Sequence, residues 1–302
     1  MVSASSIWSG GRRERSFTMK ILDVRTRPPF GSIRDGMFNN PGRELFEPEA
    51  FAPRFGMSVG ESARQRSMSL FIQEMDAAGI TLGAVLIRKS TGMDNNDLAR
   101  LDAAYPGRFI GIAGIDPLDG EEALRETEHF ALKGACRGIL LEPGFCSTPL
   151  YANDQRIYPI YELCQQHGIP VFLSFGGYVA PDLTYNSPFI IDRLALDFPS
   201  LTLVIAHGGW PFVTEICHVA FNRENVYLAP DLYTMNVPGN RDYLASANYF
   251  IPEKFLFGTA YPCVSMQEAV DYYRNWGLRP EVLPKVMYQN AADVLGIEEP
   301  SE

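Results

Sequence analysis

Short apolar runs alternate with amphipathic stretches along most of the chain. Eight of the runs are rich in β-branched and aromatic residues, which is typical of buried parallel strands. We expect these strands at 20–25, 82–88, 109–115, 137–142, 170–174, 201–207, 226–231 and 255–259. A helical period predicts helices at 64–78, 121–133, 155–167, 187–197, 211–221, 241–249, 266–276 and 281–295.

Eight strands that alternate with helices predict an α/β fold, a closed (β/α)8 or TIM barrel. A doubly wound open sheet is the alternative, but no Gly-x-Gly-x-x-Gly motif follows the first strand. We expect residues 1–18 to form a disordered tail, and residues 19–302 to form one barrel domain. The last helix, 281–295, should pack over one end of the barrel.

A long loop, residues 28–63, follows the first predicted strand. It carries five phenylalanines, at positions 30, 38, 46, 51 and 55. A loop of this length in a compact domain is usually a lid or a binding loop, although exposed aromatic side chains also mark contacts between subunits. A homodimer, the commonest soluble assembly, is the corresponding expectation for the oligomer.

Composition narrows the classes of partner. The 302-residue chain has a net charge of −10, which disfavours nucleic acid and anionic membranes as partners. No apolar run reaches the roughly 18 residues that span a bilayer. The five cysteines include no Cys-x-x-Cys pair, so we expect a reducing, cytoplasmic compartment without disulfides.

Polar residues stand at the carboxyl ends of the predicted strands, where TIM barrels carry their chemistry. Burying polar groups without partners is costly, so their clustering at one face indicates a site. The candidates are Asp23, Arg25, Arg27, Glu142, Ser174, His207, Asp231, Tyr233 and Tyr261.

Each of these candidates has a structural alternative. Arg25 and Arg27 are two apart on a strand and point to the same side, as a fork for a carboxylate or as partners of Asp23 or Glu142. His207 could be a general acid or base, or a hydrogen-bonded core residue. Asp231 could orient His207, pair with Arg25 or cap the following turn.

Two further candidates, Glu142 and Ser174, also have open roles. Glu142 could carry a proton or neutralise the arginines. Ser174 could donate a hydrogen bond to a substrate, but it is not an expected nucleophile because no Gly-x-Ser-x-Gly elbow surrounds it.

Three motifs together resemble the amidohydrolase-related metal hydrolases. They are Phe-Gly-Thr-Ala-Tyr-Pro at 257–262, Ala-His-Gly-Gly-Trp-Pro at 206–211, and Tyr-Gln-Asn-Ala-Ala at 288–292. The resemblance implies a TIM barrel acting on small cyclic esters, amides or carboxylated aromatic and unsaturated acids. It also exposes departures from the family pattern. The family's Asp-x-His-x-His on strand one is Asp23-Val24-Arg25-Thr26-Arg27 here, its strand-five histidine is Ser174, and its strand-eight aspartate is Ala260.

A guanidinium group stays protonated and has no lone pair for a metal. We therefore expect no metal at the family's usual position. The alternative is zinc or another divalent metal at a relocated site formed by Glu142, His207 and Asp231.

The resemblance then implies a hydrolase or lyase for a small organic acid. Arg25 and Arg27 would hold the carboxylate, His207 would carry the proton, and Asp231 or Glu142 would tune it. Ser174, Tyr233 and Tyr261 complete the expected substrate contacts. A non-catalytic protein that binds small anions on the same scaffold is the alternative.

Overall fold

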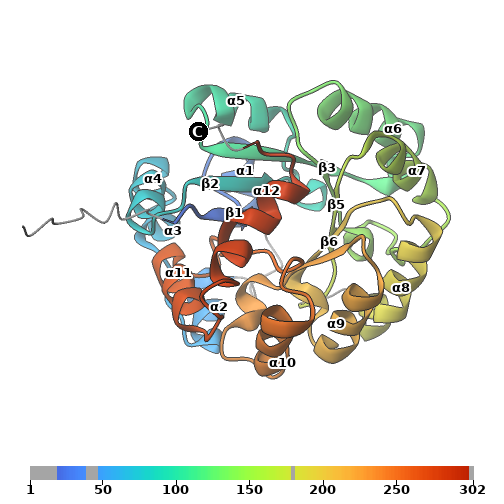
Figure 1. The fold of residues 1–302 in the computed structure, drawn as a ribbon. Coiled ribbons are helices and arrows are strands. Elements are labelled where there is room, and N and C mark those ends of the chain that lie inside the picture. Colours follow the sequence, from blue (N-terminus) through green and yellow to red (C-terminus); the bar gives the residue numbers. More distant parts are fainter. Residues whose placement is uncertain (1–18, 39–46, 178–180, 299–302) are drawn as a thin grey trace, which may run out of the picture.

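Seven parallel strands in sequential order form the centre of the molecule (Figure 1). The structure is a computed structural model and describes residues 19–38, 47–177 and 181–298. The expected tail, residues 1–18, and Phe46 of the expected lid lie outside these residues. The strands are β1 (Leu22–Thr26), β2 (Leu82–Leu86), β3 (Phe109–Ile115), β4 (Ile139–Leu141), β5 (Val171–Ser174), β6 (Leu203–Ala206) and β7 (Val226–Ala229).

Residues 254–261, which we call the closing segment, join β7 to β1. Leu228 N–H donates to the Lys254 carbonyl at 2.8 Å, and Leu256 N–H donates to the Leu228 carbonyl at 2.9 Å. On the other side, Val24 N–H donates to the Phe257 carbonyl at 2.9 Å. The sheet thus closes on itself through this segment, as expected for a TIM barrel.

The closing segment lies where the eighth strand was expected, but it pairs through isolated bridges. Two features of the chain explain this irregularity. Pro230 has no N–H with which to continue the ladder from β7. On the β1 side, Thr259 N–H donates to the side chain of Asp23 at 2.9 Å instead of to a backbone carbonyl.

Helices surround the strands, and their order follows the expected alternation (Figure 1). The expected helix 64–78 is interrupted at Arg66, whose left-handed backbone (φ 50°) ends one helix before the next begins. The outer helices are α3 (Glu61–Gln65), α4 (Met68–Ala77), α5 (Asn96–Ala104), α6 (Glu121–Thr127), α7 (Tyr158–His167), α8 (Pro188–Asp197), α9 (Val213–Asn222), α10 (Asn240–Ala245) and α11 (Met266–Asn275).

Two expectations about the helices need correction. The segment expected as one long loop after β1 contains α1 (Gly31–Phe38), α2 (Pro48–Phe51) and the 3-10 turn Ala52–Phe55. Phe51 and Phe55 are buried there, so part of the expected lid is packed structure. Helix α5 was not predicted, since its first turn is polar and only Leu98 and Leu101 mark its apolar face.

The barrel interior is filled by one side chain from most strands, because successive residues of a strand point to opposite sides. The C-terminal helix packs against this layer, as expected for 281–295, although its regular part is shorter: α12 covers Asn290–Val294. Asn290 anchors it by donating to the carbonyls of Pro252 and Phe255 at 2.9 and 2.8 Å. The interior residues are Leu22, Val24, Ala84, Leu86, Ile112, Leu140, Phe172, Val204, Ala229 and Leu256.

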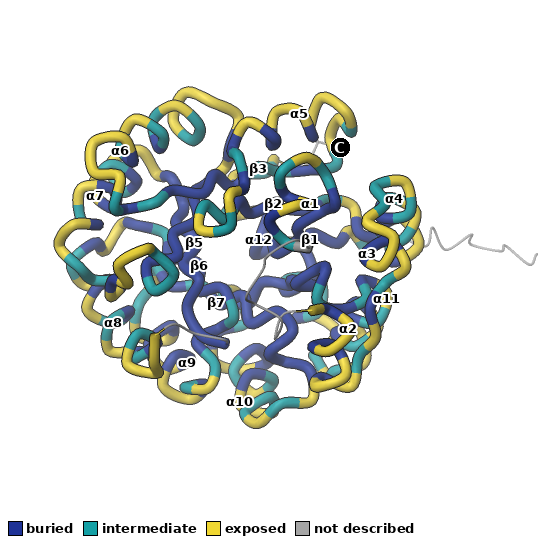
Figure 2. Tube along the Cα trace, turned by 180° about the vertical axis from the view of Figure 1, so that it is seen from behind, coloured by how far each residue is buried: buried dark blue, intermediate teal, exposed yellow. Residues whose placement is uncertain are grey.

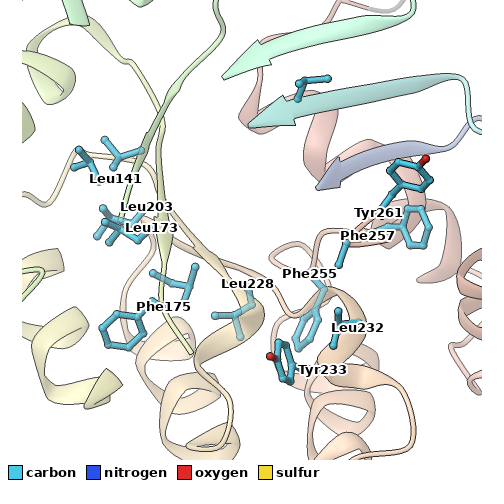
Figure 3. Close-up of a cluster of buried hydrophobic side chains, with 14 of the residues drawn as sticks. Leu141, Leu173, Phe175, Leu203, Leu228, Leu232, Tyr233, Phe255, Phe257 and Tyr261 are labelled. Carbon is cyan, nitrogen blue, oxygen red and sulfur yellow. The ribbon is translucent and has the colours of Figure 1, made fainter. Parts of the chain in front are cut away.

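A second, larger core lies between the strands and the outer helices (Figure 3). Burial is therefore concentrated around the strand ring, while the outer faces of the helices are exposed (Figure 2). All five cysteines are free thiols. Within the described residues, no helix has both the length and the apolar character to cross a membrane.

Phe172 should be essential to the barrel interior, because it is buried and fills the layer beneath the C-terminal helix. We expect Phe172→Ala to lower the free energy of unfolding by about 3 to 5 kcal/mol. Phe189→Ala is the matched control, since Phe189 on α8 is 82% exposed, and should cost less than about 0.5 kcal/mol. Urea denaturation of both variants measures the difference, and equal losses would contradict this description of the core.

Candidate functional site

A small cavity lies at the carboxyl ends of the strands, where the sequence predicted the site. Its volume is about 50 Å³, room for a few water molecules and too little for an aromatic ring. Arg25, Arg27, Arg88 and His207 supply its charged and titratable wall. The remainder of the wall is formed mainly by apolar and aromatic side chains, which are Met37, Phe51, Phe145, Leu232, Tyr233, Ala260 and Cys263.

The central contact of the site joins Arg25, His207 and Asp231. Arg25 Nη2 donates to His207 Nε2 at 2.7 Å, and Arg25 Nε lies 3.2 Å from Asp231 Oδ2. The same Oδ2 lies 2.9 Å from His207 Nδ1. Both Arg25 and Asp231 are almost completely buried. The structure thus brings together three residues that the sequence placed on three different strands.

This arrangement decides which imidazole nitrogen carries the proton. Arg25 can only donate, so neutral His207 must present the lone pair of Nε2 to it and keep its hydrogen on Nδ1, facing Asp231. Burial lowers the pKa of His207, and the neighbouring Arg25 lowers it further, whereas Asp231 acts in the opposite direction. His207 is therefore neutral near pH 7.

The backbone turns in the left-handed region at the ends of three successive barrel segments. His207, Asp231 and Ala260 have φ values of 65°, 46° and 57°. Such values are uncommon for residues other than glycine, and they cluster at functional sites where the surrounding structure enforces them. Gly208 continues the turn after His207, and a Cβ there would lie 2.6 Å from Pro230. The packing between the β6 and β7 ends therefore requires glycine.

Arg88 is a site residue that the sequence analysis missed. It follows β2, and its Nε and Nη2 donate to Glu142 at 2.9 to 3.0 Å. Ser174 Oγ donates to the same carboxylate at 2.7 Å. The strand-end rule, applied to the polar end of the expected strand 82–88, would have found Arg88. Glu142 and Ser174 are thus committed to this cluster and do not line the cavity.

The Arg88 cluster also determines the charge of Glu142. Burial acts to raise the pKa of Glu142, but Arg88, Arg27 and the hydrogen bond from Ser174 outweigh it and lower the pKa to about 2. Glu142 is therefore a permanent carboxylate at neutral pH. This is opposite to the raised pKa that a proton carrier would need.

Arg27 has no carboxylate partner among the described residues. Its Nε donates to the Leu86 carbonyl at 2.9 Å, while Nη2 is buried without a hydrogen-bond partner. Burial lowers the pKa of Arg27 well below its ordinary value, and Arg25 and Arg88 act in the same direction. Arg27 is therefore a buried guanidinium that faces the cavity without a direct ion pair among the described residues, although Glu142 acts on it at longer range.

The two tyrosines expected to contact substrate lie in different places. Tyr233 lines the cavity, edge-on to His207 at 5.3 Å and stacked on Trp210 at 5.4 Å between ring centroids. Tyr261 is instead buried against Phe71, with its hydroxyl 3.0 Å from Ser62 Oγ. The structure therefore places Tyr261 in the core and away from the cavity.

Asp23 has a structural position at the barrel closure. Its carboxylate accepts from Arg25 N–H and Thr259 N–H, both at 2.9 Å, and from the Thr259 hydroxyl at 2.6 Å. Burial raises the pKa of Asp23 to about 6, although these hydrogen bonds act to lower it. Asp23 thus ties β1 to the closing segment directly below Arg25.

The side chains at this site do not fit a divalent metal. The described residues contain no group of three or more histidine, cysteine, aspartate or glutamate side chains placed to hold one. The lone pair of His207 Nε2 faces the Arg25 guanidinium, which would repel a metal ion. Glu142, one ligand of the relocated site considered above, is engaged by Arg88.

Comparison with known proteins identifies the family. The family model described as amidohydrolase matches residues 46–297. Among curated proteins, 2-amino-3-carboxymuconate-6-semialdehyde decarboxylase of Dictyostelium discoideum is 25% identical over 170 residues, 50% of this chain. That match spans only 45% of the Dictyostelium protein. Gamma-resorcylate decarboxylase of Polaromonas sp. is 21% identical over 66% of this chain and 74% of its own length.

Solved structures share the fold of this chain. An uncharacterized TIM-barrel protein of Bordetella bronchiseptica is 36% identical, with a TM-score of 0.85 over 92% of this chain and 98% of its own. A dihydroxybenzoic acid decarboxylase of Polaromonas sp., which holds manganese and an inhibitor, shares the fold at 17% identity, with a TM-score of 0.64 over 93% of this chain and 98% of its own. The match of the family model over most of the chain shows that this protein belongs to the amidohydrolase family.

Proposed function

We propose that this protein is a lyase that binds a small unsaturated or aromatic organic acid through buried arginines and uses His207 as its proton carrier. The observation that carries the proposal is the positive charge of the site. Three guanidinium groups, of Arg25, Arg27 and Arg88, line the cavity, but among the residues that the structure describes only Asp231 and Glu142 lie within ion-pair distance of them. A buried cation without a counter-ion is unfavourable, so the site favours an anionic ligand.

The shape and lining of the cavity support the substrate class. Phe51, Phe145 and Tyr233 provide an aromatic part of the cavity wall, and the Phe145 ring lies 5.5 Å from the Arg88 guanidinium. A planar acid would place its ring against this wall and its carboxylate on the guanidinium groups. The names of the two curated relatives, decarboxylases of a carboxymuconate semialdehyde and of γ-resorcylate, are consistent with such a substrate. Because the cavity is small, binding must displace lining side chains.

The residues of this chain can support loss of carbon dioxide without further groups. As the bond between the substrate and its carboxylate breaks, the bonding electrons pass into the unsaturated system, and guanidinium groups can stabilise the charge that develops on substrate oxygens. His207 takes a proton from a substrate hydroxyl at Nε2 and returns it to the carbon that has lost carbon dioxide. Asp231 stabilises the transient imidazolium.

Two other functions remain as alternatives to the lyase. Opening of an activated lactone would use the same arginines, with His207 as the base that deprotonates water. A protein that binds anions without turnover would need only the arginines. The experiments below separate binding from catalysis.

Anion binding should depend on Arg27 at no cost to the stability of the free protein. We expect millimolar benzoate or citrate to raise the melting temperature, and benzamide to have little effect. Arg27→Met should abolish the shift while leaving the ligand-free melting temperature unchanged or higher, because it removes a buried charge that lacks a carboxylate partner. Thermal denaturation with and without ligand measures both effects.

The matched control for this experiment is Arg88→Met. This substitution leaves the buried Glu142 carboxylate without its ion-pair partner. It should lower the free energy of unfolding by about 3 kcal/mol even without ligand. If Arg27→Met behaves in the same way, or if the carboxylate shift survives in that variant, Arg27 is not the anion-binding cation.

Turnover should require His207, whereas binding should not. Asparagine tolerates the left-handed backbone at position 207, so His207→Asn preserves the turn while removing the proton carrier. Carbon dioxide release from a panel of aromatic and unsaturated acids should identify a substrate. On that substrate, the variant should lose about 100-fold or more in rate. Full activity of His207→Asn would remove the histidine from the mechanism, and inactivity of the natural protein on every acid that binds would favour the binding protein.

The buried Arg88–Glu142 pair should make stability depend on pH in the acid range. A pKa that is lower in the folded state contributes stability above the ordinary glutamate value, and this stability is lost as the pH falls towards about 2. Glu142→Gln should therefore cost about 3 kcal/mol at neutral pH. The difference in unfolding free energy between the natural protein and Glu142→Gln should shrink by about 2 kcal/mol by about pH 3, because Glu142 becomes protonated in the unfolded natural protein.

The control is Glu121→Gln on α6, where the carboxylate is 90% exposed and should contribute almost nothing. Urea denaturation across the pH range measures this difference for both variants. A difference for Glu142→Gln that is the same at both pH values would contradict a permanently charged Glu142.

A further inference from the structure

We infer that Arg25 is a removable cap on His207: it holds the Nε2 lone pair of the histidine in the free protein and releases it when its guanidinium turns to the carboxylate of a bound ligand. The release step rests on the proposed anion-binding function, whereas the cap itself does not.

The first support is the contact itself. The Arg25 Nη2 to His207 Nε2 distance is 2.7 Å, and Nε2 is the nitrogen that the proton-carrier role requires. A lone pair that accepts a hydrogen bond from a guanidinium cannot take a proton from a substrate at the same time. In the free protein, the base is therefore present but blocked.

The second support is that Arg25 keeps unused binding capacity. Its Nη1 is buried and has no hydrogen-bond partner, and the side chain lines the cavity. A carboxylate bound at Nη1 and Nη2 together would replace one neutral acceptor by a charged, bidentate one. The guanidinium can keep its ion pair with Asp231 through Nε while Nη2 turns from the histidine to the ligand.

The third support is the way in which His207 is held after release. Its Nδ1 remains beside Asp231 Oδ2, which Arg25 Nε continues to contact, and its ring remains edge-on to Tyr233. The histidine would therefore keep its orientation when the cap moves. Proton transfer would follow ligand binding because the ligand's own carboxylate unblocks the base.

Acylation of imidazole nitrogen by diethyl pyrocarbonate can test the cap. The reagent needs a free lone pair, and a single tryptic peptide, residues 194–223, contains both His207 and the exposed His218. His218 thus serves as an internal reference for the reagent in the same mass spectrum. In the free natural protein, we expect His207 to react much more slowly than His218.

Removing the guanidinium should expose the lone pair. Arg25→Met should raise the acylation rate of His207, relative to His218, roughly tenfold or more. This factor corresponds to the free energy of one hydrogen bond to a charged group. Arg25→Lys is the second variant, since it keeps a charge beside Asp231 but cannot serve both partners. The matched control is Arg27→Met, which removes a buried arginine two residues away that does not contact His207. Circular dichroism checks that each variant is folded.

Formate, the smallest carboxylate, tests the release step without covering the histidine. It should speed the acylation of His207 in the natural protein, formamide should not, and neither should change the rate in Arg25→Met. An unchanged His207 rate in both Arg25 variants, or an equal rise in Arg27→Met, would overturn the cap.

Formate that stabilises the natural protein but slows acylation, or leaves it unchanged, would overturn the release step alone. Formate, benzoate and citrate that all fail to stabilise the protein would overturn the proposed anion binding together with the release step. The result with the Arg25 variants would still decide the cap.

Discussion

The buried guanidinium of Arg25 is the constraint on which the rest of the site depends. A cation at this depth is tolerated only because a carboxylate and an imidazole from two other strands converge on it. Asp231 and His207 reach it from left-handed turns at the ends of β7 and β6. The left-handed backbone at these two residues is therefore what brings their side chains to the buried charge of Arg25.

Closure of the barrel is coupled to the same arrangement. Asp23 binds the backbone of Arg25 and both the backbone and the hydroxyl of Thr259, which join β1 to the closing segment. The junction between β1 and the closing segment is thus held by a carboxylate that also binds the backbone of Arg25. A substitution that weakens this junction would also displace the Arg25 guanidinium. The stability of the fold and the geometry of the site are therefore not independent.

The sequence could predict the strands because their apolar runs are short, separate and punctuated by glycine and proline. It also placed Arg25, Arg27, His207 and Asp231 at one end of the barrel, since strand ends share one face. The pairing of these polar groups could be predicted only as alternatives, among which were Asp231 with His207 or Arg25. Partner choice depends on side-chain reach across strands, so the commitment of Glu142 to Arg88, and of Tyr261 to the core, appears only in three dimensions.

Ala260 has a consequence for how such a site can change over time. Its backbone keeps a left-handed conformation that suits aspartate or asparagine better than alanine, although its methyl group does no chemistry at the cavity wall. The turn thus has a backbone geometry that an aspartate, the residue of the family pattern at this position, can adopt. A single substitution, Ala260→Asp, would place a carboxylate at the cavity wall without rebuilding the turn and would change the charge balance of the site.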